Sequence, residues 1–221
     1  MHQRWHEISF LHWRCQPALL QDRLPPQLRL DQFDGSAWLS LTPFLLQGMR
    51  PPLVPRFLGL DFPETNLRTY VLGPDGPGIW FFSLDAGRLS AVVGARAVYG
   101  LPYYRAEMEV KITDRDLLYV SNRSGRANVA IRIERGAAIS APSQRDLFLT
   151  ARFRLYSLRK RTLLTAEVSH PPWQLNALRI LQFEEGLRQA AGLLFEGDPD
   201  LCHHSVGVDA KIGPPIPSHQ K

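Results

Sequence analysis

Residues 64–84 read ETNLRTYVLGPDGPGIWFFSL and contain two segments with the character of β-strands, one on each side of a tight turn. In residues 64–71, one face carries polar side chains and Tyr70, whereas Leu67 and Val71 fall on the other. Proline, aspartate and glycine at 74–78 are typical of a turn. Residues 79–84 are mostly apolar or aromatic on both faces, which indicates a buried strand. This stretch therefore predicts two strands inside a β-rich domain.

The same reading outward from this stretch predicts many short strands separated by turn signals. Strands are expected at 8–13, 36–44, 104–113, 117–122, 128–139, 152–158, 162–170, 175–183 and 201–212. Short helices are expected at 17–23, 90–99 and 184–194, with one or two helical turns at 144–151. A long loop rich in proline and glycine is expected at 47–63. The pattern favours a mainly β fold, in which a curved antiparallel sheet closes into a barrel with a few short helices.

Length and composition are consistent with one domain over residues 1–221, of which 213–221 form a proline-rich tail. The net charge of +5 comes from arginines that are interleaved with 21 acidic residues, so we expect no nucleic-acid partner. No run of 18 apolar residues is present, which predicts no membrane-spanning segment. The N-terminus shows no secretory signal, and Cys15 and Cys202 have no metal-ligand spacing. A cytoplasmic protein with reduced thiols is the expectation.

Three histidines, His12, His170 and His204, are placed by strand periodicity on apolar faces that we expect to point inward. Three such side chains could hold a metal if their strands were neighbours. None has the short spacing that makes a metal site readable, so we predict that they line a cavity or stabilise packing and bind no metal. A phosphate-binding loop and a dinucleotide fingerprint are also absent, and no cofactor is predicted.

The polar face of residues 64–70 allows two interpretations. Glu64, Asn66, Arg68 and Tyr70 could form an exposed face, or they could line the inside of a barrel. Both arrangements give the same alternation along the strand. A buried Glu64 would need an ion pair with Arg68 or Arg96, or else a raised pKa.

Eight ordered segments resemble the YqjF-like bacterial proteins, a family whose name carries no reaction. They are FLHW at 10–13, DGSAW at 34–38, PETNLRTYV at 63–71, WFFSLDA at 80–86, GLPY at 100–103, TARF at 150–153, HPPW at 170–173 and HSVGVD at 204–209. The match runs in order from about residue 5 to 215.

A more distant resemblance is to acetoacetate decarboxylase, through Glu64, SLD at 83–85, VGAR at 93–96 and PYY at 102–104. In that enzyme two lysines follow the proline, and the first forms a Schiff base with the substrate ketone. Tyr103 and Tyr104 stand in those positions here, whereas Glu64 and Arg96 match a glutamate and an arginine of the decarboxylase. The resemblance implies a cone-like β barrel around a buried cavity, and it argues against the decarboxylase chemistry.

No other lysine is expected to replace the missing pair. Lys160 and Lys221 fall in a predicted turn and in the tail, Lys211 lies near the end of the chain, and Lys111 shares a strand face with acidic residues. Amine catalysis is therefore not expected.

Two functions remain open. The favoured one is non-covalent binding of a small carbonyl-bearing, carboxylate-bearing or apolar molecule. The alternative is an enzyme of the lyase, hydratase or isomerase type that uses Glu64 with Tyr103 or Tyr104 for acid–base catalysis. Oligomerisation of the chain with itself is left open. The candidate pocket residues are His12, Glu64, Asn66, Arg68, Tyr70, Arg96, Tyr103, Tyr104, His170 and His204.

Overall fold

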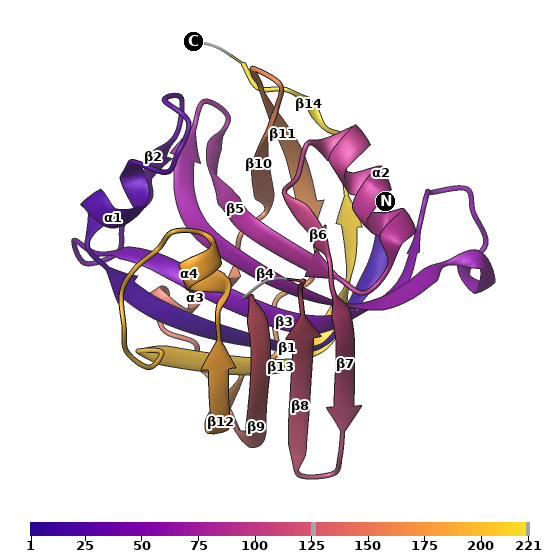
Figure 1. The fold of residues 1–221 in the computed structure, drawn as a ribbon, viewed down its shortest axis with the longest axis vertical. Helices are drawn as coiled ribbons and strands as arrows, with labels where there is room; N and C mark the ends of the chain where they lie inside the picture. The colour runs from indigo at the N-terminus through magenta and orange to yellow at the C-terminus, as the bar shows by residue number, and fades with distance from the viewer. Residues whose placement is uncertain (125–126, 220–221) are drawn as a thin grey trace.

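A closed ring of seven strands forms the centre of the molecule in the computed structural model, which describes residues 1–124 and 127–219 (Figure 1). Around the ring the strands are β1 (His2–Cys15), β3 (Ala37–Arg50), β4 (Leu60–Gly73), β5 (Gly76–Ala86), β10 (Arg154–Arg159), β11 (Thr162–Ser169) and β13 (Leu201–Ile212). The ring closes where β11 meets β13, with Val168 opposite Ile212, and where β13 meets β1. The predicted mainly β fold with a sheet that curves back on itself is confirmed.

Most strand pairs are antiparallel, as predicted, but β5 has parallel neighbours. Leu155 of β10 lies opposite Ile79, and the short strand β6 (Tyr103–Arg105) runs beside Leu84–Ala86. Parallel neighbours need a crossover connection. The chain between β5 and β10 supplies it with a helix and further strands.

A second layer covers the outside of the ring. The strands β12 (Asn176–Glu185), β9 (Asn128–Ala138), β8 (Asp116–Asn122) and β7 (Glu107–Ile112) continue the sheet from β13 and occupy the lower half of Figure 1. Leucines that point out of the ring, such as Leu11, Leu41 and Leu67, pack with Ile131 and Ile133 of β9. The ring strands are therefore buried on both faces, and their inner face is left to enclose a cavity.

The helices are short, and one prediction among them is wrong. They are α1 (Pro17–Gln21), α2 (Leu89–Tyr99), α3 (Gln144–Thr150), α4 (Leu187–Ala190) and the 3-10 turn η1 (Arg56–Leu58). The helix expected over 184–194 is only α4, because Glu184 and Glu185 still pair with β9 and Gly192 turns the chain at a φ of 73°. The expected helices at 17–23 and 90–99 correspond to α1 and α2.

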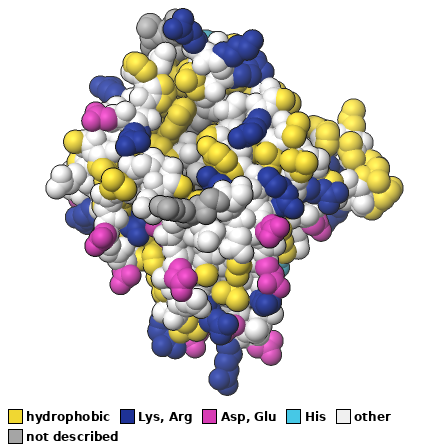
Figure 2. Space-filling model, viewed as in Figure 1, with side chains coloured by type: hydrophobic (Ala, Val, Ile, Leu, Met, Phe, Trp, Pro, Cys, Tyr) yellow, Lys and Arg dark blue, Asp and Glu magenta, His cyan; other side chains and the backbone are white. Residues whose placement is uncertain are grey.

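The loop expected at 47–63 is shorter than predicted, because β3 runs to Arg50 and β4 begins at Leu60. The two strand ends meet closely: the Gly48 amide donates to Asp61, and a Cβ on Gly59 would lie 2.7 Å from the Gly48 backbone. The remaining loop projects at the right of Figure 1. It carries the fully exposed Leu53 and the largely exposed Phe57, and Figure 2, in the same view, shows an apolar protrusion on this side of the molecule. Two short strands, β2 (Arg29–Leu30) and β14 (Ile216–Pro217), complete the sheet.

No helix among the described residues has both the length and the apolar character needed to cross a membrane.

Candidate functional site

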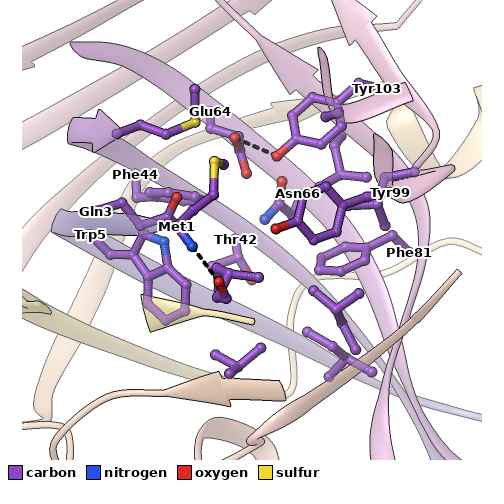
Figure 3. A pocket seen from close by; sticks show the side chains of 18 of the residues that line it. Met1, Gln3, Trp5, Thr42, Phe44, Glu64, Asn66, Phe81, Tyr99 and Tyr103 are labelled. Carbon is purple, nitrogen blue, oxygen red and sulfur yellow. Dashed lines mark hydrogen bonds between the residues drawn. The ribbon is translucent and has the colours of Figure 1, made fainter. Parts of the chain in front are cut away.

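A cavity of about 300 Å³ lies inside the ring, and helix α2 covers one side of it. Small residues of α2 line the cavity, among them Ala91, Gly94 and Ala95. Most of the wall is apolar or aromatic, with Trp5, Ile8, Phe44, Phe62, Phe81, Leu84, Tyr99, Leu101, Leu155 and Trp173 (Figure 3). The volume is at the small end of ligand pockets, which suits a small metabolite.

Glu64 is the carboxylate of this cavity. Strand β4 places it between Phe44 of β3 and Ala86 of β5, and only 3% of it is exposed. Its Oε2 accepts a hydrogen bond of 2.9 Å from the Tyr103 hydroxyl (Figure 3). Burial raises the pKa of Glu64 to about 7, although hydrogen bonds from Tyr103 and Asn66 partly oppose the rise. Near neutral pH this side chain can therefore either accept or donate a proton.

Tyr103 reaches Glu64 because the chain turns sharply after α2. Gly100 ends the helix in the left-handed conformation, at a φ of 65°, and Pro102 leads into β6. The parallel pairing of β6 with β5 then sets Tyr103 opposite Leu84 and aims its hydroxyl into the cavity. Burial, with the nearby Glu64, raises the pKa of Tyr103 well above its ordinary value, so the phenol remains a hydrogen-bond donor at neutral pH.

Arg68 lies further along the same face of β4 and also lines the cavity. Its guanidinium carbon is 5.6 Å from the centre of the Phe10 ring, and its Nε has no hydrogen-bond partner among the described residues. The expected ion pair of Glu64 with Arg68 or Arg96 is not formed. Glu64 leans toward Tyr103 on the β5 side, whereas Arg68 extends toward β1, so the raised pKa is the outcome the structure shows for Glu64.

Asn66 and Thr42 lie between these two groups as a cross-strand pair of β4 and β3. Both are at least nine-tenths buried and line the cavity (Figure 3). The Asn66 Oδ1 and Thr42 Oγ1 atoms have no partner among the described residues. Buried polar atoms are nearly always hydrogen-bonded, so this pair is equipped to bind a polar group of a ligand.

Tyr70 and His12 lie below the cavity rather than in its wall. The Tyr70 hydroxyl is 2.6 Å from Ser40 Oγ and donates to the Leu149 carbonyl, while His12 Nδ1 is 2.5 Å from the same Ser40 oxygen. Both side chains are fully buried. Burial, together with nearby His203 and Arg68, holds the pKa of His12 well below its ordinary value. They stabilise the floor of the ring and do not line the cavity.

Arg96 and Tyr104 are placed outside, which corrects their expected position in the pocket. Tyr104 follows Tyr103 in an extended strand and therefore points to the opposite side. The guanidinium carbons of Arg123 and Arg96 lie 3.8 Å and 5.4 Å from the centre of its ring. Arg123 in turn pairs with the buried Asp85. This stack is a packing feature of the outer surface.

The structure places the three predicted histidines in different surroundings. His170 lines the cavity beside Trp5 and Trp173, and burial lowers its pKa. His204 was expected to face inward, and this is wrong: it lies opposite Ser9 on the outer face of the ring, with its Nε2 3.1 Å from Glu7. A group of three or more His, Cys, Asp or Glu side chains suited to a metal ion does not occur in residues 1–124 and 127–219.

The inward histidine of β13 is His203, which sequence reasoning missed. It lies opposite Phe10, its ring centre is 5.5 Å from that of His12, and its Nε2 is 3.0 Å from Asp146. A bulge of β1 against β3 between His6 and Leu11, where Glu7 adopts a φ of 47°, explains the error. The register of β1 with β13 is the same on both sides of Glu7, and Gly207, opposite His6 at a φ of 124°, makes the matching change in β13, so parity counted from the apolar Val206 and Val208 fails at 204.

The sequence analysis also missed several residues of the wall. Thr42 and Phe44 alternate with buried leucines in the expected strand 36–44, a signal that could have identified them. Trp5 and Arg152 gave no such signal, because one precedes the bulge and the other follows α3 outside any strand.

Solved structures place this architecture in a known class. The enduracididine biosynthesis enzyme MppR, in a structure with pyruvate, superposes with a TM-score of 0.72 at 13% identity, over 99% of this chain and 90% of that one. Acetoacetate decarboxylase from Legionella pneumophila gives 0.66 at 13% identity, over 99% and 88%. An acetoacetate decarboxylase-like enzyme from Sphingomonas wittichii gives 0.66 at 14%, over 99% and 93%. The chain therefore has the acetoacetate decarboxylase-like fold.

Sequence comparison gives the family. Residues 2–209 match DUF2071, described as an uncharacterized conserved protein, and the uncharacterized protein YqjF of Bacillus subtilis is 36% identical over 97% of this chain and 90% of its own length. The chain belongs to the DUF2071 family.

Proposed function

We propose that the protein binds a small, largely apolar metabolite bearing a carbonyl or carboxylate group, without forming a covalent bond to it. One observation carries the proposal: Glu64 and Tyr103 meet at 2.9 Å inside a mostly apolar cavity of about 300 Å³. A hydrogen-bonded pair in such surroundings orients a polar group of a ligand, while the aromatic wall contributes affinity through burial. MppR has a structure with pyruvate bound, and it is similar in fold.

The distribution of lysine supports binding without a Schiff base. The residues that line the cavity in the described part of the chain include no lysine. Lys111 is exposed on β7, with its Nζ 3.2 Å from Glu109, and Lys160 occupies the tip of the hairpin between β10 and β11. Attack on a ketone by an amine requires a neutral amine near the bound substrate. We accordingly expect no decarboxylation of acetoacetate and no borohydride-trapped adduct on any lysine.

A second function is favoured by the pKa of Glu64 at about 7. A carboxyl group that titrates near neutrality, beside a phenol that stays protonated, is the pair that proton transfer at a carbon next to a carbonyl would use. Glu64 would act as the base and Tyr103 as the hydrogen-bond donor to the developing oxyanion. Tyr104 is no longer a candidate for this role because it points out of the cavity.

A thermal-shift screen of small carbonyl and carboxylate metabolites tests the proposal. A ligand raises the melting temperature by mass action, and the hit names the ligand class. We expect Glu64→Gln and Tyr103→Phe to weaken binding of the hit at least about tenfold, a change of about 1.4 kcal/mol. Glu109→Gln, on an exposed strand, is the matched control and should bind as the wild type does.

The outcome also separates the two functions. Turnover of the hit that disappears in Glu64→Gln would identify an enzyme, whereas binding without turnover would identify a binding protein. Unchanged affinity in both cavity variants would contradict the proposed site.

A further inference from the structure

The cavity has an excess of positive charge at one end. Arg68 has no carboxylate within ion-pair distance among the described residues, and its Nε is unpartnered. Arg152 lines the same region, but it is paired with Asp31 at 2.6 Å. His170 lies nearby, and burial lowers its pKa, which favours the neutral imidazole. A neutral imidazole does not compensate the positive charge of Arg68. A partly buried guanidinium without a counterion is costly, and an anionic ligand would offset that cost.

The Glu64–Tyr103 pair lies at the other end. Glu64 and Arg68 are four positions apart in an extended strand, which sets their Cα atoms about 13 Å apart. The side chains also diverge, because Glu64 turns toward Tyr103 on β6, whereas Arg68 crosses toward Phe10 on β1. One short functional group cannot contact both ends.

The space between the two ends has its own polar pair in an apolar lining. Thr42 and Asn66 present unpartnered oxygens there, and Phe44 and Phe81 contribute aromatic surface. Three polar features therefore follow one another along one side of a mostly apolar cavity. They are the Arg68 cation, the hydrogen-bonding pair of Thr42 and Asn66, and the weak acid Glu64.

We propose that the cavity takes an elongated monocarboxylate, with its carboxylate on Arg68 and a ketone or hydroxyl several carbons away on the Glu64–Tyr103 pair. The inference rests on the proposed function and adds the length and polarity of the ligand. A guanidinium matches a carboxylate in charge and geometry, and Tyr103 donates to the distal oxygen. A β-keto acid, in which one carbon separates the carboxylate from the ketone, is too short to reach both ends.

Calorimetric titration with four probes tests this at about pH 6, where Glu64 is mostly protonated. The probes are 5-oxohexanoate, its methyl ester, hexanoate and freshly prepared acetoacetate. We expect 5-oxohexanoate to bind at least about tenfold more tightly than each of the other three. The ester lacks the charge, hexanoate lacks the ketone, and acetoacetate lacks the length.

Variants then assign the carboxylate to Arg68. Arg68→Met should bind the acid and the ester equally, whereas Arg68→Lys should keep part of the preference for the acid. Arg179→Met, at an exposed ion pair on β12, should behave as the wild type does. Melting curves without ligand check that each variant is folded.

Two results would overturn the inference. One is equal affinity of wild-type protein for the acid and the ester, and the other is affinity for acetoacetate equal to that for 5-oxohexanoate. If the ester binds as tightly as the acid, in a way that depends on Glu64, this inference fails while the proposed function stands. If no probe and no compound of the metabolite screen binds, both fail.

Discussion

At the scale of single residues, Glu64 contributes to how the stability of the protein depends on pH. Its pKa is about 7 in the folded protein because of burial, against 4.5 for an exposed glutamate. Between these values the folded chain holds a proton that the unfolded chain has released, so the free energy of unfolding decreases as pH rises. We expect this group to cost about 3 kcal/mol of stability by pH 8, relative to pH 4. Chemical denaturation of wild type and Glu64→Gln across this range measures the difference.

The Glu64→Gln variant should lose that decrease and become relatively more stable than wild type above pH 7. Glu109→Gln is the control, since Glu109 is exposed and its substitution should leave the profile unchanged. Parallel profiles for wild type and Glu64→Gln would show that Glu64 titrates normally.

At the scale of elements, the close pairing of β1 with β13 near Glu7 depends on Gly207. Its φ is 124°, and a Cβ there would lie 1.9 Å from the carbonyl oxygen of Trp5. An alanine would have to separate the two strands, because a backbone oxygen cannot move aside alone. We expect Gly207→Ala to reduce the free energy of unfolding by on the order of 3 kcal/mol or more, measured by denaturant titration.

Gly94 in α2 provides the matched glycine. It has an ordinary helical conformation, and a Cβ there would meet nothing within 4 Å. Gly94→Ala should therefore stabilise the protein, by about 1 kcal/mol from helix propensity. A loss of stability in this variant, or none in Gly207→Ala, would contradict the geometry of the corresponding element.

At the scale of the whole molecule, Glu7 links the ring to the outer layer. It is buried, and its carboxylate lies 3.1 Å from Arg135 of β9 and 3.1 Å from His204 of β13. Burial raises the pKa of Glu7, but the nearby His204 together with the hydrogen bond and charge of Arg135 outweigh burial, so its pKa is lowered overall. The stabilisation is therefore present above the ordinary pKa of a glutamate and is lost as pH falls through the folded value.

We expect Glu7→Gln to be clearly less stable than wild type at neutral pH, with the difference narrowing in acid. Denaturant titrations at neutral and acid pH measure it. Glu134→Gln breaks the exposed pair with Arg179 between β9 and β12, and it should change stability much less. A difference for Glu7→Gln that does not depend on pH would mean that packing, and not charge, links the layers.

The sequence by itself determined the class of fold and one side of the site. Local alternation placed Glu64, Asn66 and Arg68 on one face of a strand, and the PYY segment at 102–104 placed a tyrosine near Glu64 by resemblance to the decarboxylase. Alternation is a property of consecutive residues, so it can be read without knowing the partner strands. The same reasoning could not decide whether that polar face was exposed or enclosed.

Tertiary structure decided that question and the rest of the site. The cavity exists because β11 pairs with β13, and that closure joins segments about 40 residues apart in the chain. The bulge of β1 at Glu7, with the matching change at Gly207 of β13, exchanges His204 for His203, and Gly207 meets Trp5 across two strands distant in sequence. Whether Glu64 is ion-paired or has a raised pKa also depends on where two side chains point. The Glu64 carboxylate turns toward Tyr103 of β6, and the Arg68 guanidinium turns toward Phe10 of β1. Each outcome depends on contacts between distant segments, and local periodicity carries no information about them.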